Sequence, residues 1–130
     1  MSGNSLTSEA LEAAVLEAES QGFAVVRSND TTLLLDLDSP FAIRQFRRVL
    51  PIVQEHFGAG AAQMWLSKSG NTHVLVPLRE GLDPLLRFAL QAALGSDGVR
   101  ETLNFTQLLN GCNEPSILFK PNGSKVEDVV

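Results

Sequence analysis

Residues 31–40 read TTLLLDLDSP, three consecutive leucines that run into two aspartates separated by one residue. The apolar run predicts a strand, and successive side chains of a strand point to opposite faces. The leucines at positions 33, 35 and 37 therefore share one face, and Asp36 and Asp38 share the other with Leu34. Because each residue advances a strand by about 3.3 Å, we expect the two carboxylates about 6 to 7 Å apart.

Two interpretations of this pair of carboxylates remain open. Like charges at this separation raise each other's pKa and destabilise the fold unless a positive charge lies between them. Mg²⁺ or Mn²⁺ would supply that charge, since magnesium is usually held by one or two carboxylates, waters and substrate phosphates. In the alternative, Asp38 only helps to cap a helix that begins at Ser39, and Asp36 is solvated. Taken alone, the pair favours this second interpretation.

The composition limits the class of protein. A chain of 130 residues with 44% hydrophobic and 19% charged residues fits one soluble, intracellular globular domain. The start, MSGNSLTSEA, lacks the pattern of a signal peptide, and no apolar run approaches a membrane span. Cys112 is the only cysteine, which excludes a disulfide framework. The net charge of −5 restricts nucleic-acid binding to a local basic patch.

The periodicity of hydrophobic residues, together with capping and turn residues, predicts an alternation of helices and strands. We expect residues 23–27 and 31–38 to form a hairpin, and a helix from Ser39 that kinks or breaks at Pro51. The other expected elements are helices at 6–21, 82–95 and 98–111 and strands at 63–70, 72–78 and 116–120.

The order of these elements predicts the fold class. Without the first helix and first strand, it is strand, helix, strand, strand, helices, strand, which is typical of the ferredoxin-like and RNA-recognition (RRM-like) arrangement. We therefore expect an α+β fold, an antiparallel sheet with flanking helices. Residues 1–130 form one domain, with an N-terminal helix within 1–22 and a flexible tail at 121–130.

Two further stretches carry polar residues in small-residue turns. In SKSGNTHVLVPL, Lys68 and Ser69 precede His73, which begins a strand expected to neighbour the aspartate strand. Such a turn could hold phosphate through backbone N–H groups and positive charge, although a lone histidine is more often structural. In ALGSDGVRE, Asp97 lies between two helices, where capping of the second helix is its simplest role.

Together, these stretches resemble the archaeo-eukaryotic primase (primase-polymerase) superfamily. LLLDLD matches the family's strand that ends in Asp-x-Asp or Asp-x-Glu. SGNTHVLVPL matches its second motif, often Ser-Gly-x-Gly-x-His-Val, at Ser69, Gly70, His73 and Val74 and is one residue shorter than that common form. The segment from Asp97 to Lys120 is a weaker counterpart of the third motif. The resemblance covers about residues 31–122 and is typical of compact phage and plasmid members, reduced to a catalytic core.

The resemblance implies a DNA primase/polymerase-like nucleotidyltransferase that uses two Mg²⁺ or Mn²⁺ ions in DNA replication. Asp36, Asp38 and Asp97 would be the catalytic, metal-binding residues. The residues implied to bind the nucleotide are His73, Ser69, Lys68, Arg100 and Lys120. The implied partners are nucleotide triphosphates and a single-stranded nucleic-acid template, with a replicative helicase as a candidate, in the cytoplasm of a bacterial or phage-infected host cell.

Other interpretations remain open. The domain could be a catalytically degenerate primase-like module that binds nucleic acid or nucleotide, or a ferredoxin-like protein-interaction module whose acids only cap helices. Arg44, Arg47 and Arg48 could contact template phosphates, although a solvated basic face is the more frequent explanation. Trp65 is expected in the core, with base stacking as its alternative role.

Overall fold

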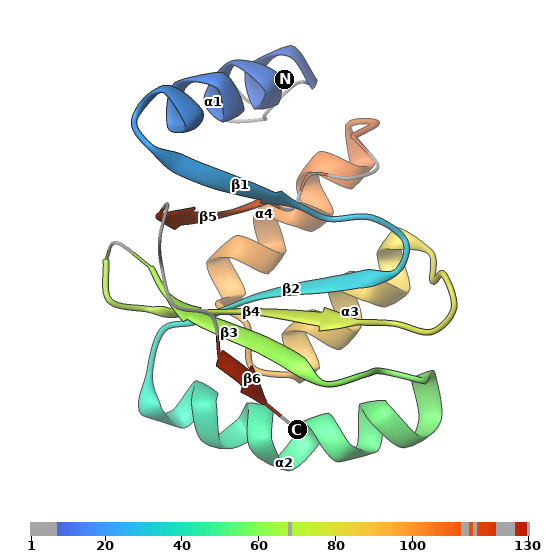
Figure 1. The fold of residues 1–130 in the computed structure, drawn as a ribbon. Coiled ribbons are helices and arrows are strands. Elements are labelled where there is room, and N and C mark those ends of the chain that lie inside the picture. The colour runs from blue at the N-terminus through green and yellow to red at the C-terminus, as the bar shows by residue number, and fades with distance from the viewer. Residues whose placement is uncertain (1–7, 68, 113–114, 116, 122–126, 130) are drawn as a thin grey trace.

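The structure, a computed structural model, describes residues 8–67, 69–112, 115, 117–121 and 127–129 (Figure 1). Helices and strands follow one another in ten elements. They are α1 (Ser8–Ser20), β1 (Phe23–Arg27), β2 (Thr32–Leu37), α2 (Pro40–Phe57), β3 (Ala62–Leu66), β4 (Thr72–Pro77), α3 (Pro84–Ala93), α4 (Gly98–Leu109), β5 (Ile117–Pro121) and β6 (Glu127–Val129).

Four strands form the main sheet in the order β2-β4-β3-β6, and β1 and β5 form a separate two-stranded sheet. The strand pairs are antiparallel. The register places Asp36 of β2 opposite His73 of β4, and His73 opposite Trp65 of β3. The prediction that the aspartate strand and the histidine strand are neighbours is therefore confirmed.

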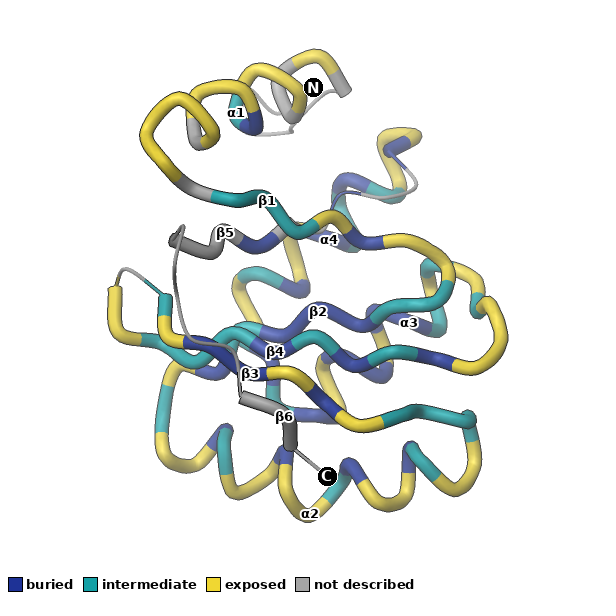
Figure 2. The backbone as a smooth tube through the Cα atoms, viewed as in Figure 1, coloured by how far each residue is buried: buried dark blue, intermediate teal, exposed yellow. Residues whose placement is uncertain are grey.

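One face of the main sheet, the leucine face, is defined by Leu33, Leu35 and Leu37. All three side chains are buried, and they belong to one apolar cluster with residues of α2 and α3 such as Phe46 and Leu90. Figure 2 shows the buried positions of α2 on the side turned toward the sheet. The alternation predicted from the sequence is confirmed, because the odd-numbered leucines do supply the core.

Helix α2 begins where the sequence places it but does not break where expected. The Ser39 hydroxyl oxygen accepts a hydrogen bond from the Ala42 N–H at 3.1 Å and caps the helix. Of the kink or break predicted at Pro51, the break is wrong, since α2 continues past this residue as one helix. Leu50 and Val53, on either side of the proline, are both buried in the core, and this packing holds the helix where one backbone hydrogen bond is missing.

The predicted hairpin between residues 23–27 and 31–38 is also wrong. β1 pairs with β5, whereas β2 pairs with β4. Val26 and Leu118 of the small sheet pack on Leu34 and Trp65, on the face of the main sheet opposite the leucine face. The turn after β1 therefore carries the chain from one layer to the next, because the main sheet has apolar residues to bury on both faces.

Part of the C-terminal segment predicted as a flexible tail lies in strands, since β5 ends at Pro121. Residues 127–129 form β6, which pairs with β3 at one edge of the main sheet. Residues 122–126 and 130 lie outside the described residues. β3 therefore has a partner on both of its edges, and β2 lies at the opposite edge of the sheet.

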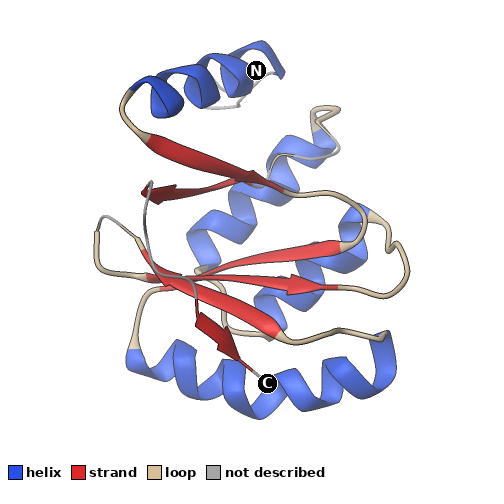
Figure 3. Ribbon diagram, in the orientation of Figure 1, coloured by secondary structure: helices blue, strands red, loops and turns tan. Residues whose placement is uncertain are grey.

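The architecture is α+β, an antiparallel sheet flanked by helices and compatible with a ferredoxin-like arrangement (Figure 3). The predicted fold class is confirmed. Within the described ranges, no helix has both the length and the apolar character needed to cross a membrane.

Candidate functional site

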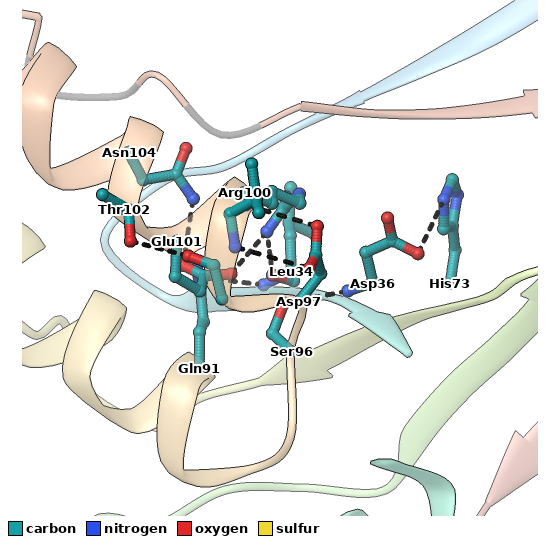
Figure 4. A network of polar contacts seen from close by, with 12 residues as sticks. Leu34, Asp36, His73, Gln91, Ser96, Asp97, Arg100, Glu101, Thr102 and Asn104 are labelled. Carbon is teal, nitrogen blue, oxygen red and sulfur yellow. Dashed lines mark hydrogen bonds and ion pairs between the residues drawn. The ribbon is translucent and has the colours of Figure 1, made fainter. Parts of the chain in front are cut away.

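A row of three side chains crosses the main sheet on the face opposite the leucine face. Asp36, His73 and Trp65 come from β2, β4 and β3 in that order. The His73 Nε2 and Asp36 Oδ1 atoms are 3.6 Å apart (Figure 4), and the rings of Trp65 and His73 meet edge to face with centroids 6.0 Å apart. The imidazole therefore lies between a carboxylate and an indole, which limits its orientation.

The carboxylate of Asp36 is only partly accessible. Its side chain is 19% exposed and that of His73 is 12% exposed. The Asp36 Oδ1 atom is buried and accepts no hydrogen bond from the described residues, since 3.6 Å is longer than a hydrogen bond. A buried carboxylate oxygen without a donor destabilises the fold. A cation or a hydrogen-bond donor from outside the chain would satisfy it.

The backbone of Asp36 is held by the segment between α3 and α4. In the described part of the chain no strand pairs with the outer edge of β2. Instead, the Asp36 N–H donates to Ser96 Oγ at 3.0 Å, and the Asp97 N–H donates to the Asp36 carbonyl at 2.8 Å. Gly95 permits this approach, because its φ is +96° and a Cβ there would lie 2.8 Å from the Ala42 carbonyl oxygen.

Two residues before Asp36 on the same strand, side chains of α3 and α4 form hydrogen bonds with the backbone of Leu34. Gln91 Oε1 accepts a hydrogen bond from the Leu34 N–H at 3.0 Å, and Arg100 Nη1 donates to the Leu34 carbonyl at 3.0 Å. The buried Glu101 carboxylate accepts from Gln91 at 2.8 Å and from Arg100 at 2.7 Å. With Ser96 and with Asn104, which also donates to Glu101, these residues form the outer-edge network (Figure 4).

The outer-edge network bonds the free edge of β2 as a neighbouring strand would. Backbone groups at an open edge of a sheet need partners, and here polar side chains supply them. Gln91 and Ser96 were not among the site residues predicted from the sequence. The available signal was Gln91, a polar residue beside Leu90 and Leu94 at buried positions of α3, where a hydrogen-bonded partner is to be expected.

The three aspartates predicted to bind metal take different positions. Asp36 lies in the cross-sheet row, and Asp38 is exposed just beyond the end of β2. Asp97 caps α4, with its carboxylate accepting from two N–H groups of the first turn at 3.3 and 3.4 Å. Its predicted capping role is confirmed. Among the residues that the structure describes, no group of three or more His, Cys, Asp or Glu side chains is placed to hold a metal ion.

The turn between β3 and β4 uses its own polar groups. Ser69 is exposed, and its hydroxyl lies 3.0 Å from that of Ser67. The N–H groups of Gly70 and Asn71 donate to the carbonyl and the hydroxyl of Ser67, each at 3.0 Å. These two N–H groups are therefore engaged within the turn and do not form the expected phosphate cradle. Lys68 lies outside the described residues.

The two basic residues of the weakest motif lie in different places. Arg100 belongs to the outer-edge network, so a contact to a triphosphate would have to share its guanidinium with Leu34 and Glu101. Lys120 lies in β5 opposite Ala24, and its side chain is outside what the structure describes. The structure therefore brings Asp36 together with His73, and the Asp97 backbone together with the Asp36 backbone, but leaves Arg100 in a supporting role.

The carboxylates of Asp36 and Asp38 are hard oxygen ligands of the kind that Mg²⁺ and Mn²⁺ prefer. The Asp36 side chain is 19% exposed but its Oδ1 atom is buried, so a hydrated cation would bind that oxygen only if the side chain turned toward solvent. Magnesium keeps several waters and is commonly bound through one or two carboxylates and substrate phosphates. A third acidic side chain is therefore not required for a cation to bind here.

Comparison with protein-family models, with curated proteins and with solved structures found no match to this chain.

Proposed function

We propose that this chain is a template-dependent nucleotidyltransferase of the primase-polymerase type, which joins nucleotides with the help of Mg²⁺ or Mn²⁺. The observation that carries the proposal is the pairing of its two clearest motifs. Asp36 of the Asp-x-Asp strand and His73 of the second motif are cross-strand partners, with Nε2 and Oδ1 3.6 Å apart. Residues distant in the sequence thus meet on one face of the sheet, at a carboxylate oxygen that has no hydrogen-bond donor among the described residues.

The proposed roles follow from these positions. Asp36 and Asp38 would hold the divalent cation, which when bound stabilises negative charge on the transferring phosphate and lowers the pKa of an attacking hydroxyl. His73, oriented by Asp36 and Trp65, would donate a hydrogen bond to the incoming triphosphate. The rigid β2 strand supports this role, because a site on a regular element keeps its geometry better than one on a loop.

Asp97 would join the cation only by giving up its cap on α4. The substitution Asp97→Asn separates the two roles, because asparagine is an equally good N-cap but a poorer cation ligand. If Asp97 binds the cation, Asp97→Asn lowers activity without lowering the melting temperature. If it only caps, neither quantity changes.

The decisive experiment combines activity and melting temperature. Wild type, Asp36→Asn and Asp38→Asn are incubated with Mn²⁺, a single-stranded template and labelled nucleotides at low salt. We expect each substitution to lower incorporation by about 100-fold or more, since charge stabilisers of the transition state contribute on that scale. His73→Gln should mainly raise KM, because its phosphate contact exists before transfer as well as during it. Mn²⁺ should raise the melting temperature of wild type but not of Asp36→Asn.

A matched control is Asp83→Asn. Asp83 caps α3 through its carboxylate as Asp97 caps α4, but it belongs to no predicted motif. It should retain wild-type activity and the wild-type response to Mn²⁺. Equal incorporation by wild type and Asp36→Asn, or equal stabilisation of both by Mn²⁺, would refute the proposal.

A second candidate is a nucleotide-binding domain of the same kind without catalysis. It is favoured by one observation: Asp97 is engaged in a helix cap, and no third acidic group joins the other two among the described residues. This candidate predicts that wild type binds labelled nucleotide in a manner that depends on Mn²⁺ and His73 but incorporates none. Absence of both metal and nucleotide binding would leave the protein-interaction module.

A further inference from the structure

The outward side of α2 carries an exposed aromatic ring among arginines. Phe41 is 77% exposed, and the Arg44 guanidinium carbon lies 4.5 Å from the centre of its ring. Arg48 and Ile52 follow on the same side and are also exposed. We call these four residues the α2 outer face. In Figure 2 the exposed positions of α2 lie on the side turned away from the sheet.

The charge on this helix contrasts with that of the whole chain. The net charge is −5, yet α2 holds Arg44, Arg47 and Arg48, and its only acidic residue is Glu55 near its end. None of these three arginines forms an ion pair with a described residue. The chain has an excess of acidic residues, yet none of those described pairs with these arginines. Their charges therefore form a local positive surface that is complementary to a polyanion.

We propose that the α2 outer face binds single-stranded nucleic acid. Proteins that bind single strands combine positive charge along the backbone with aromatic side chains on which bases stack. Phe41 offers a ring to an unstacked base, and Arg44 and Arg48 lie within two turns of it to meet the phosphates. An acidic protein partner would pair with the arginine charges, but it offers no planar base to stack on Phe41.

Phe41 lies close in the sequence to the end of β2. It lies in the first turn of α2, three residues after Asp38 and two residues after the Ser39 cap. A nucleic acid on this face would therefore pass near Asp38 at the end of β2, whereas the Asp36 side chain lies on the opposite face of the sheet. That the bound nucleic acid serves as a template rests on the proposed function, whereas the binding itself does not.

The test measures binding of a fluorescein-labelled oligothymidylate of about 16 nucleotides by anisotropy, at low and at moderate salt. Phe41→Ala should weaken binding at least about fivefold, from the loss of base stacking. The double substitution Arg44→Ala/Arg48→Ala should weaken it and flatten the dependence of log affinity on log salt by about 1.4, at about 0.7 for each single-strand phosphate contact. All three side chains are exposed, so the fold should tolerate these changes.

Two matched controls lie elsewhere on the surface. Leu85→Ala removes an exposed apolar side chain from α3, and Arg79→Ala removes an exposed arginine outside α2. Both should bind the oligonucleotide as wild type does. Asp36→Asn should also bind it without loss, so that a failed transfer reaction and a failed strand-binding surface give different results.

Three results would overturn the proposal. Equal losses in the controls and in the α2 variants would show that the face is not specific. Equal competition by heparin or duplex DNA at matched charge would show that an unstacked base is not read. A change of oligomeric state in Phe41→Ala, with unaltered strand binding, would make this face an interface between copies of the chain.

Discussion

The leucine face of β2 and its outer edge are held in different ways. On the leucine face, Leu33, Leu35 and Leu37 pack against α2 and α3, where many apolar neighbours share the contact. On the outer edge, Gln91, Arg100 and Ser96 of the outer-edge network each bond one backbone group of β2. Apolar packing is non-directional and depends on volume, whereas a hydrogen bond depends on one donor and one acceptor in the right place.

This difference bears on the candidate site, because the outer-edge network acts on the same strand that carries Asp36. Ser96 and Asp97 bond both backbone groups of Asp36, while His73 faces its side chain from the neighbouring strand and is itself packed against Trp65. The leucine face stabilises the fold, and the outer edge fixes the position of the Asp36 backbone. Substitutions in the two regions should therefore separate the free energy of unfolding from activity.

The largest effect is expected from Leu35→Ala. Leu35 is completely buried, and the substitution removes apolar contacts and leaves a cavity. We expect the free energy of unfolding to fall by about 2 to 5 kcal/mol. Urea denaturation followed by circular dichroism measures it. A loss below about 1 kcal/mol would mean that the leucine face is loosely packed and would remove the contrast with the outer edge.

The next largest effect is expected when methionine replaces one residue in each region, and the losses of unfolding free energy are compared. Leu35→Met nearly conserves volume and should cost less than about 1.5 kcal/mol. Gln91→Met also keeps the side chain long, but it leaves the buried Leu34 N–H without its acceptor and the Glu101 carboxylate without one donor. We expect a loss of about 1 to 3 kcal/mol, since each unsatisfied buried group carries its own desolvation penalty.

The same denaturation experiment measures both methionine variants, and nucleotide binding provides a second measurement. At a temperature where both proteins are folded, Gln91→Met should weaken binding more than Leu35→Met, because only the former loosens the edge beside Asp36. If Leu35→Met destabilises the protein as much as Gln91→Met does, the outer edge is not the more specific of the two regions.

The smallest effect is expected where a polar contact is as well formed as in the outer-edge network but exposed. Arg27 donates two hydrogen bonds to Glu12, at 2.7 and 2.8 Å, and thereby links β1 to α1. The hydrogen bond from Arg27 lowers the pKa of the Glu12 carboxyl below its usual value. Both side chains are about half exposed, so water and salt screen the pair.

The pH dependence follows from the direction of that shift. A carboxyl with a lowered pKa in the folded protein contributes stability above its unfolded pKa, and that contribution is lost as the pH falls through the folded value. The difference in unfolding free energy between wild type and Glu12→Gln should therefore be small at pH 7 and should disappear in acid or at high salt. A difference that grows as the pH falls would contradict the assignment.

The sequence by itself determined the local features of this protein. Alternation in TTLLLDLDSP placed three leucines in the core, and Ser39 and Asp97 cap the helices that the sequence assigned to them. It also predicted that the strands of Asp36 and His73 are neighbours. These features depend on periodicity, capping and short connections, which a few consecutive residues specify.

Only the tertiary structure decided which groups are free to act. It paired β1 with β5 instead of β2, and it engaged Arg100 with Leu34 and Glu101 at the open edge of the sheet. It also left the Asp36 Oδ1 atom buried beside His73 without a donor from the described residues. The physical reason is that strand partners and buried polar contacts form between residues far apart in the chain. The choice among them depends on which surfaces and backbone groups remain to be satisfied once the layers pack.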